Sequence, residues 1–179
     1  MSVDPADYED LELEELTVVS VTSSSANEVL AALQSSAVPL GDASDPDEDD
    51  EYTRAAWFTH QLGPDVVAVE YSGYHDPSVA TLAALSAVGR RAAVARSNID
   101  AQVRFGCAED GRVLFDDDEF AFAEDRSGLP AELTGLMDAV WVDLDAEESD
   151  DDGAAPMLTA LAMAETFTGV RPLPALQGD

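Results

Sequence analysis

The chain has 179 residues, 46% of them hydrophobic, a length and composition typical of one globular domain. It carries 38 acidic and 8 basic residues, and the formal net charge of −30 disfavours direct binding to nucleic acid or to an anionic membrane. No apolar run approaches the roughly 20 residues that a membrane span requires, and the acidic start of the chain is unlike a secretory signal. A single cysteine, Cys107, excludes an internal disulfide, so we expect a cytoplasmic protein.

The acidic residues are concentrated in runs. Seven of the ten residues in 42–51 are acidic, as are seven of the ten in 143–152. Runs of like charge repel themselves, so we expect both segments to be mobile surface loops of a single domain spanning residues 1–179. The charge could simply solvate the surface, or it could attract a basic partner, and the sequence leaves both explanations open.

The first half of the chain alternates strand and helix patterns. Apolar, β-branched stretches predict three strands, at residues 16–21, 55–62 and 66–71. Between the first two, Ser25 and Glu28 form a capping box that predicts the start of a helix. After the third strand, Asp76 and Pro77 are expected to be the N-cap and first residue of a second helix.

The second half predicts three more strands, at residues 91–98, 102–107 and 112–115. The pair Asp110-Gly111 predicts a tight turn that joins the last two strands in a hairpin. Helices are expected to begin at Pro130 and at Pro156, and Gly169 is expected to end the second of these.

The predicted order, β-α-β-β-α-β followed by a hairpin and two helices, indicates an α+β protein. Its first six elements match a ferredoxin-like split βαβ arrangement, a two-layer structure of one sheet with helices packed on it. We expect the inward-facing residues of these elements to lie in one core, namely Val67, Val69, Leu82, Leu85, Val94, Phe105 and Leu161.

No catalytic or metal-binding signature is present, so we predict no cofactor, no metal site and no catalytic residue, and an enzyme is the less favoured interpretation. His60 lies mid-strand on an apolar face, and Cys107 alternates with apolar residues, so both are expected to be structural. The acidic run 45–50 lacks the glycine and the closing acid of a calcium loop. No phosphate-binding glycine motif occurs.

If the protein has a site, the sequence places it where the strand 66–71 ends. Glu70 closes an otherwise apolar strand, and ligands of α/β sheets often gather beyond strand ends. Polar residues expected at the same end are Tyr74, His75, Arg96, Asn98 and Arg104. The arginines could hold an anionic ligand bidentately. The simpler interpretation is a cross-strand ion pair between Glu70 and Arg96, with Tyr74 covering the edge of the core.

Residues 66–100 (VVAVEYSGYHDPSVATLAALSAVGRRAAVARSNID) and 102–116 (QVRFGCAEDGRVLFD) resemble the core of an actinobacterial, streptomycete-type domain family of unknown function. The stretch APMLTALAMAETFTGVRPLP resembles the closing helix of that family, although Phe167 stands where a leucine is usual. The resemblance covers about residues 16–174. It implies a source and a fold, and no activity.

Two functional hypotheses follow. The first is a non-enzymatic interaction module that binds a protein partner, such as a basic one, through an acidic surface, with neutralisation of a toxin or mimicry of nucleic acid as specific versions. The alternative is a domain that binds a small molecule, or an enzyme, with a pocket around Glu70 and its neighbours. The first is favoured. The partner and the oligomeric state are left open.

Overall fold

The computed structural model describes residues 3–11, 13–35, 57–141 and 155–177. Both acidic runs, 42–51 and 143–152, lie outside the described residues, so their prediction as loops is not addressed.

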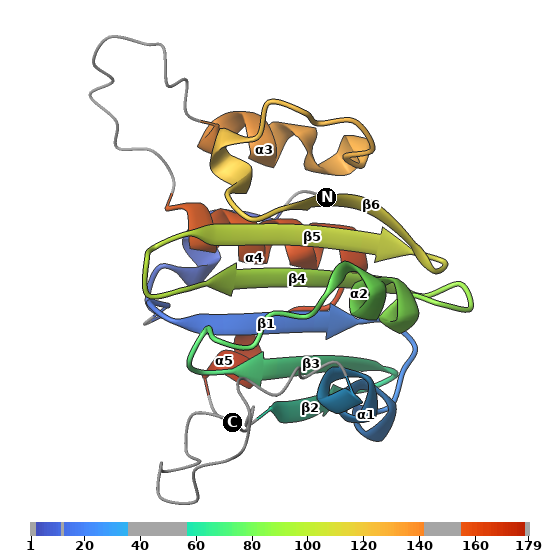
Figure 1. The fold of residues 1–179 in the computed structure, drawn as a ribbon. Helices are drawn as coiled ribbons and strands as arrows, with labels where there is room; N and C mark the ends of the chain where they lie inside the picture. The colour runs from blue at the N-terminus through green and yellow to red at the C-terminus, as the bar shows by residue number, and fades with distance from the viewer. Residues whose placement is uncertain (1–2, 12, 36–56, 142–154, 178–179) are drawn as a thin grey trace, which may run out of the picture.

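A six-stranded antiparallel sheet forms the centre of the protein, with the order β2-β3-β1-β4-β5-β6 (Figure 1). The strands are β1 (Leu16–Val21), β2 (Phe58–Leu62), β3 (Asp65–Glu70), β4 (Arg91–Ser97), β5 (Val103–Glu109) and β6 (Arg112–Asp117). Every residue of β1 is buried, as expected of an apolar strand with a neighbour on each side. The strand predictions from the sequence therefore agree with the described structure to within a few residues.

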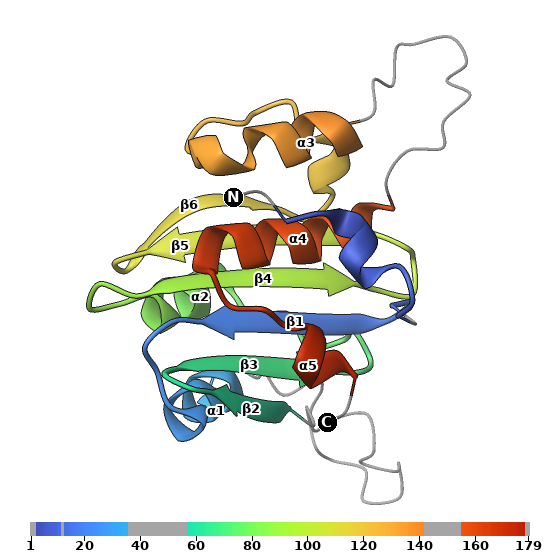
Figure 2. The same ribbon diagram turned by 180° about the vertical axis from the view of Figure 1, so that it is seen from behind.

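Helices cover both faces of the sheet, which is the middle of three layers (Figures 1 and 2). The helices α1 (Ala26–Ser35) and α2 (Val79–Leu85) pack on one face. The 3₁₀ helix η1 (Pro5–Tyr8), α4 (Pro156–Thr168) and α5 (Leu173–Leu176) lie on the other, and α3 (Thr134–Val140) lies beyond the β6 edge. The α+β class is confirmed, and the ferredoxin-like assignment stays a prediction.

The expectation of a single core is wrong, because the sheet separates two clusters of buried side chains. Alternate residues of a strand point to opposite faces. Thus Val67, Val69, Phe105 and Leu161 belong to the cluster beneath α4. The other cluster, beneath α1 and α2, contains Leu82, Leu85 and Val94.

Helix boundaries follow local capping chemistry. The predicted capping box at α1 is confirmed, because the Glu28 amide donates to Ser25 Oγ at 3.3 Å and Glu28 Oε2 accepts from the Ser25 amide at 3.2 Å. The predicted start of α2 is wrong: Ser78 is the N-cap and accepts from the Thr81 amide at 3.1 Å. This shift of two residues leaves the carboxyl group of Asp76 free for other contacts.

Several short elements carry no clear sequence pattern. The stretch after Pro130 begins as the 3₁₀ helix η4 (Ala131–Leu133) before it becomes α3. The 3₁₀ helices η1 and η3 (Phe120–Phe122) and the four-residue α5 were not predicted. The long helix α4 begins at Pro156 as expected, and Gly169, with φ 73°, follows it in the left-handed conformation typical of a helix C-cap.

Candidate functional site

Residues 71–78, which we call the strap, run from the end of β3 to α2 across the face of the sheet that α2 covers (Figure 1). Gly73, with φ 64°, lies so close to β4 that a Cβ at this position would collide with the Ser97 carbonyl oxygen. Glycine is therefore required here for both its positive φ and its lack of a side chain. The strap is consequently in direct contact with the sheet.

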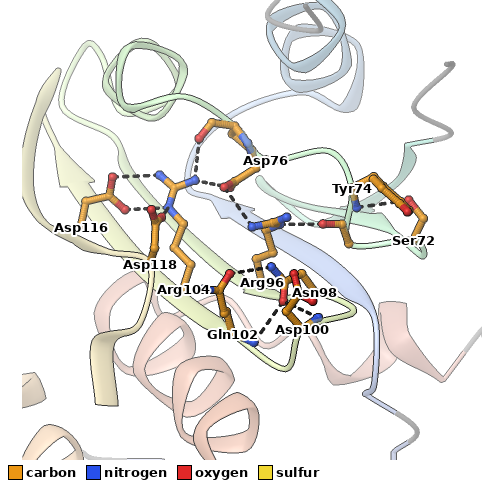
Figure 3. A network of polar contacts seen from close by, with 12 residues as sticks. Ser72, Tyr74, Asp76, Arg96, Asn98, Asp100, Gln102, Arg104, Asp116 and Asp118 are labelled. Carbon is orange, nitrogen blue, oxygen red and sulfur yellow. Dashed lines mark hydrogen bonds and ion pairs between the residues drawn. The ribbon is translucent and has the colours of Figure 1, made fainter. Parts of the chain in front are cut away.

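Arg104 of β5 connects three parts of the molecule and is only 3% exposed (Figure 3). Its Nε and Nη2 donate to Asp116 Oδ1 and Oδ2 at 2.7 and 2.9 Å, and its Nη1 donates to the Pro77 carbonyl at 2.7 Å and to Asp76. Burial alone would lower the pKa of Arg104, yet hydrogen bonds and ion pairs with Asp116 and Asp76 raise it above its ordinary value. This guanidinium therefore holds β5, β6 and the strap together.

The position of Asp116 depends on the absence of a side chain on its neighbour in β5. Gly106 lies opposite Asp116 in the β5–β6 ladder, and a Cβ on Gly106 would lie 2.6 Å from Asp116 Oδ1. Glycine here lets the Asp116 carboxylate turn inward over the sheet, where it meets Arg104.

Arg96 of β4 fastens the strap at a second place (Figure 3). Its Nε donates to the Gly73 carbonyl at 2.7 Å, and its Nη1 donates to Asp76 Oδ2 at 3.2 Å. Because Asp76 accepts from Arg104 through its other oxygen, one carboxylate joins both arginines. The strap residue that we expected to cap α2 is in fact the centre of an ion-pair network.

Asn98 organises the turn between β4 and β5. Its Oδ1 accepts from the amides of Asp100 and Gln102, each at 3.0 Å, and its Nδ2 donates to Gln102 Oε1 at 3.0 Å. The structure therefore gives Asn98 a role within the turn and places the side chain of Gln102 beside it (Figure 3).

An open groove of about 530 Å³ lies beside this network. It is lined by Arg96, Gln102, Asp116, Asp117, Asp118 and Glu119. Asp116 is committed to Arg104, whereas the Asp118 side chain is 81% exposed and lies 3.8 Å from Arg104 Nε. The groove thus presents consecutive carboxylates at the end of a strand whose position Arg104 fixes.

Two buried oxygens lie further along the same face of the sheet. Thr17 is paired with Glu70 on one side and with Arg96 on the other, because β1 lies between β3 and β4. Thr17 is 0% and Glu70 4% exposed. Glu70 Oε1 accepts from the amide and hydroxyl of Ser72, but Glu70 Oε2 and Thr17 Oγ1 have no hydrogen-bond partner among the residues that the structure describes.

Several of the residues that the sequence suggested as a site lie near one another around the strap. Glu70 contacts the strap at Ser72, and the backbone of Asn98 lies next to Gly73. The Tyr74 side chain, in contrast, is exposed. The expected cross-strand ion pair between Glu70 and Arg96 is wrong, because β1 separates their strands and Arg96 pairs with Asp76.

Tyr74 donates its amide to Ser72 Oγ at 3.3 Å, and the adjacent His75 is half-buried in the strap. The contacts that join the candidate residues come mainly from residues that sequence reasoning missed, namely Asp76, Asp116, Ser72, Gln102 and Thr17. One signal pointed to Thr17: it is one of two polar residues in β1, with Ser20, and it lies on the same face as Val19 and Val21.

The structural interpretation of Cys107 is confirmed. It belongs to the core beneath α4, and burial raises the pKa of its thiol to about 12. His60 is half-buried in β2. Among the described residues, no three histidine, cysteine or acidic side chains gather closely enough to hold a metal ion.

A comparison of this chain with known protein families gave a match over residues 12–176, which is nearly the whole chain. The chain belongs to a family of unknown function, DUF6461. The match spans every strand of the sheet, the strap and the groove, so these features lie within the family domain. Neither the curated proteins nor the solved structures gave a match. Within the described part of the chain, no helix is long and apolar enough to cross a membrane.

Proposed function

We propose that this protein is a non-enzymatic binding module that holds a basic segment of a protein partner in the acidic groove. The observation that carries the proposal is the lining of the groove by Asp116, Asp117, Asp118 and Glu119. The basic group at its edge, Arg96, is already bonded to the strap, so the groove has carboxylates to offer a ligand and no uncommitted guanidinium.

The same contacts argue against an anionic ligand held by the arginines. Arg104 donates to Asp116, to Asp76 and to the Pro77 carbonyl, and it is almost completely buried. An anion could bind Arg104 only by displacing carboxylates that are already paired with it. Displacing a partner from a buried charge is costly, so a cationic ligand is the better fit.

The net charge of −30 supports this choice of partner. A strongly negative surface attracts a basic protein over distance and raises the rate of productive encounters. Proteins that themselves bind nucleic acid, including toxins of that kind, have basic surfaces of the required chemistry. A direct contact with nucleic acid is disfavoured by the same charge.

The test compares two variants that each lose three carboxylates. The groove variant carries Asp117→Asn, Asp118→Asn and Glu119→Gln, and the first of these changes retains the side-chain oxygen that accepts from the Glu119 amide in the native turn. The control variant carries Glu9→Gln, Asp10→Asn and Glu124→Gln, all at exposed positions outside the groove. Binding of a fluorescent pentalysine peptide is measured by anisotropy at low salt.

We expect the groove variant to bind the peptide at least about tenfold more weakly than the control variant, which corresponds to about 1.4 kcal/mol. Added salt should weaken binding to the control variant, because exposed charges more than about 8 Å apart are largely screened at physiological ionic strength. Equal binding by the two variants would reject the groove and leave only a diffuse effect of net charge.

A further inference from the structure

Thr17 and Glu70 form a row of polar side chains with the arginines of the site. Thr17 of β1 lies directly opposite Glu70 of β3 on one side and Arg96 of β4 on the other. The alternation of side chains along a strand places all three on the face that α2 covers. Such opposed side chains have Cβ atoms about 4.5–5.5 Å apart. A single donor group can therefore contact both Thr17 Oγ1 and Glu70 Oε2.

Burying these two oxygens without partners is unfavourable for the free protein. An unsatisfied buried polar atom loses its hydration and gains nothing in return, and such atoms in a folded protein call for an explanation. Thr17 Oγ1 and Glu70 Oε2 carry this cost side by side, next to Arg96 at the edge of the groove. Buried oxygens that have no hydrogen-bond partner in the free protein are characteristic of positions where a ligand supplies the missing donor.

The two oxygens also restrict the chemistry of the donor. A guanidinium binds best when both oxygens of one carboxylate are available to its planar fork. Glu70 Oε1 is occupied by the amide and the hydroxyl of Ser72, so Glu70 has one oxygen to offer. A primary ammonium is a compact group with three donors, and it needs only separate acceptors such as Glu70 Oε2 and Thr17 Oγ1.

We propose that Thr17 and Glu70 form a subsite for a primary ammonium group, which makes the groove selective for lysine over arginine side chains. This inference rests on the proposed function, because the lysine belongs to the basic segment held in the groove. Since Glu70 is 4% exposed and Arg96 fastens the Gly73 carbonyl, binding of the ammonium group requires this end of the strap to move away from β4.

The first variant is Glu70→Gln. The amide oxygen can still accept from Ser72, and a neutral amide costs less to bury than the carboxylate whose Oε2 has no partner. We expect the free variant to melt at a higher temperature than the wild type, by about 2–4 °C. We also expect its affinity for pentalysine to fall about tenfold or more, with little change for pentaarginine.

A second variant, Thr17→Val, replaces the unpartnered hydroxyl by a methyl group of similar size. It should also raise the melting temperature and reduce the preference for lysine. Glu124→Gln is the control, because it removes one exposed carboxyl group and should leave the melting temperature and the lysine preference unchanged.

The possible outcomes separate the two proposals. Equal affinity of the wild type for the two peptides, with dependence on Asp117–Glu119 retained, would overturn the ammonium subsite and leave the groove. Loss of stability in both variants would also overturn the subsite, because the two oxygens would then have a structural role. Absence of binding by the wild type would overturn the proposed function and the subsite with it.

Discussion

Arg104 donates two parallel hydrogen bonds to Asp116, from Nε to Oδ1 at 2.7 Å and from Nη2 to Oδ2 at 2.9 Å. This pair joins β5 to β6, and Nη1 of Arg104 donates to Asp76 and to the Pro77 carbonyl of the strap. Because Arg104 is buried and has little contact with water, it depends on the partly buried Asp116 for its hydrogen bonds.

Arg104→Ala should therefore lower the free energy of unfolding by about 1–3 kcal/mol, since it leaves the partly buried carboxylate of Asp116 unpaired. The matched control is Arg171→Ala, whose side chain is 52% exposed and lies 3.9 Å from Asp7. An exposed pair of this kind contributes about 0–1 kcal/mol. Denaturation in urea measures both values, and similar losses in the two variants would contradict the central role of Arg104.

Gly73→Ala should destabilise the protein more than Gly63→Ala. Both glycines have φ 64°, so alanine at either position costs about 1–2 kcal/mol from the backbone alone. At Gly63 the new methyl group has open space, whereas at Gly73 it collides with Ser97, which adds about 1–3 kcal/mol of overpacking. Equal losses would mean that the strap does not pack against β4 as described.

The two cores should respond independently to truncation. Leu82→Ala and Leu161→Ala each remove a fully buried side chain, on opposite faces of the sheet, and each should cost about 2–5 kcal/mol. Because the sheet separates the two sites, the loss in the double variant should equal the sum within about 0.5 kcal/mol. A clear departure from additivity would indicate one shared core.

The stability of the protein should fall as pH rises above about 9. Burial raises the pKa of the Cys107 thiol from its ordinary value of 9.0 to about 12. Between these values the unfolded chain loses this proton while the folded chain retains it, which favours unfolding by up to about 1.4 kcal/mol per pH unit.

Cys107→Ala should remove this contribution. Tyr8 does not affect this comparison. Burial and its hydrogen bond to Glu165 raise its pKa in the wild type and in the variant alike, so its contribution to the pH dependence is the same in both. Unfolding in urea at several pH values between 9 and 11 should give a shallower decline for the variant. Parallel declines would show that the thiol ionises normally in the folded state.

The strands and long helices were predictable because their signals are local. The β-branched run that became β1, the capping box at Ser25 and the Pro156 to Gly169 frame of α4 each specify an element through nearby residues. The presence of two cores was not predicted. Whether two strands expose the same face to one helix depends on pairing register, which no local pattern contains.

The candidate site was predicted in position and not in detail. Glu70 and Arg96 do lie at one end of the sheet, but β1 separates them, and this strand order is a non-local property. Asp76 was expected to cap a helix because its sequence context fits an N-cap equally well. Its two arginine partners lie 20 and 28 residues away, beyond the reach of capping rules.

The most direct test of the acidic groove as the binding site is an NMR titration that locates the basic ligand on the protein. Pentalysine is added to isotopically labelled protein at low salt, and the shifts of the backbone amide signals are followed. We predict the largest shifts at Gln102 and at Asp116, Asp117, Asp118 and Glu119, which line the groove. Largest shifts at Glu9, Asp10 or Glu124, or equal shifts at all exposed acids, would contradict the acidic groove as the binding site.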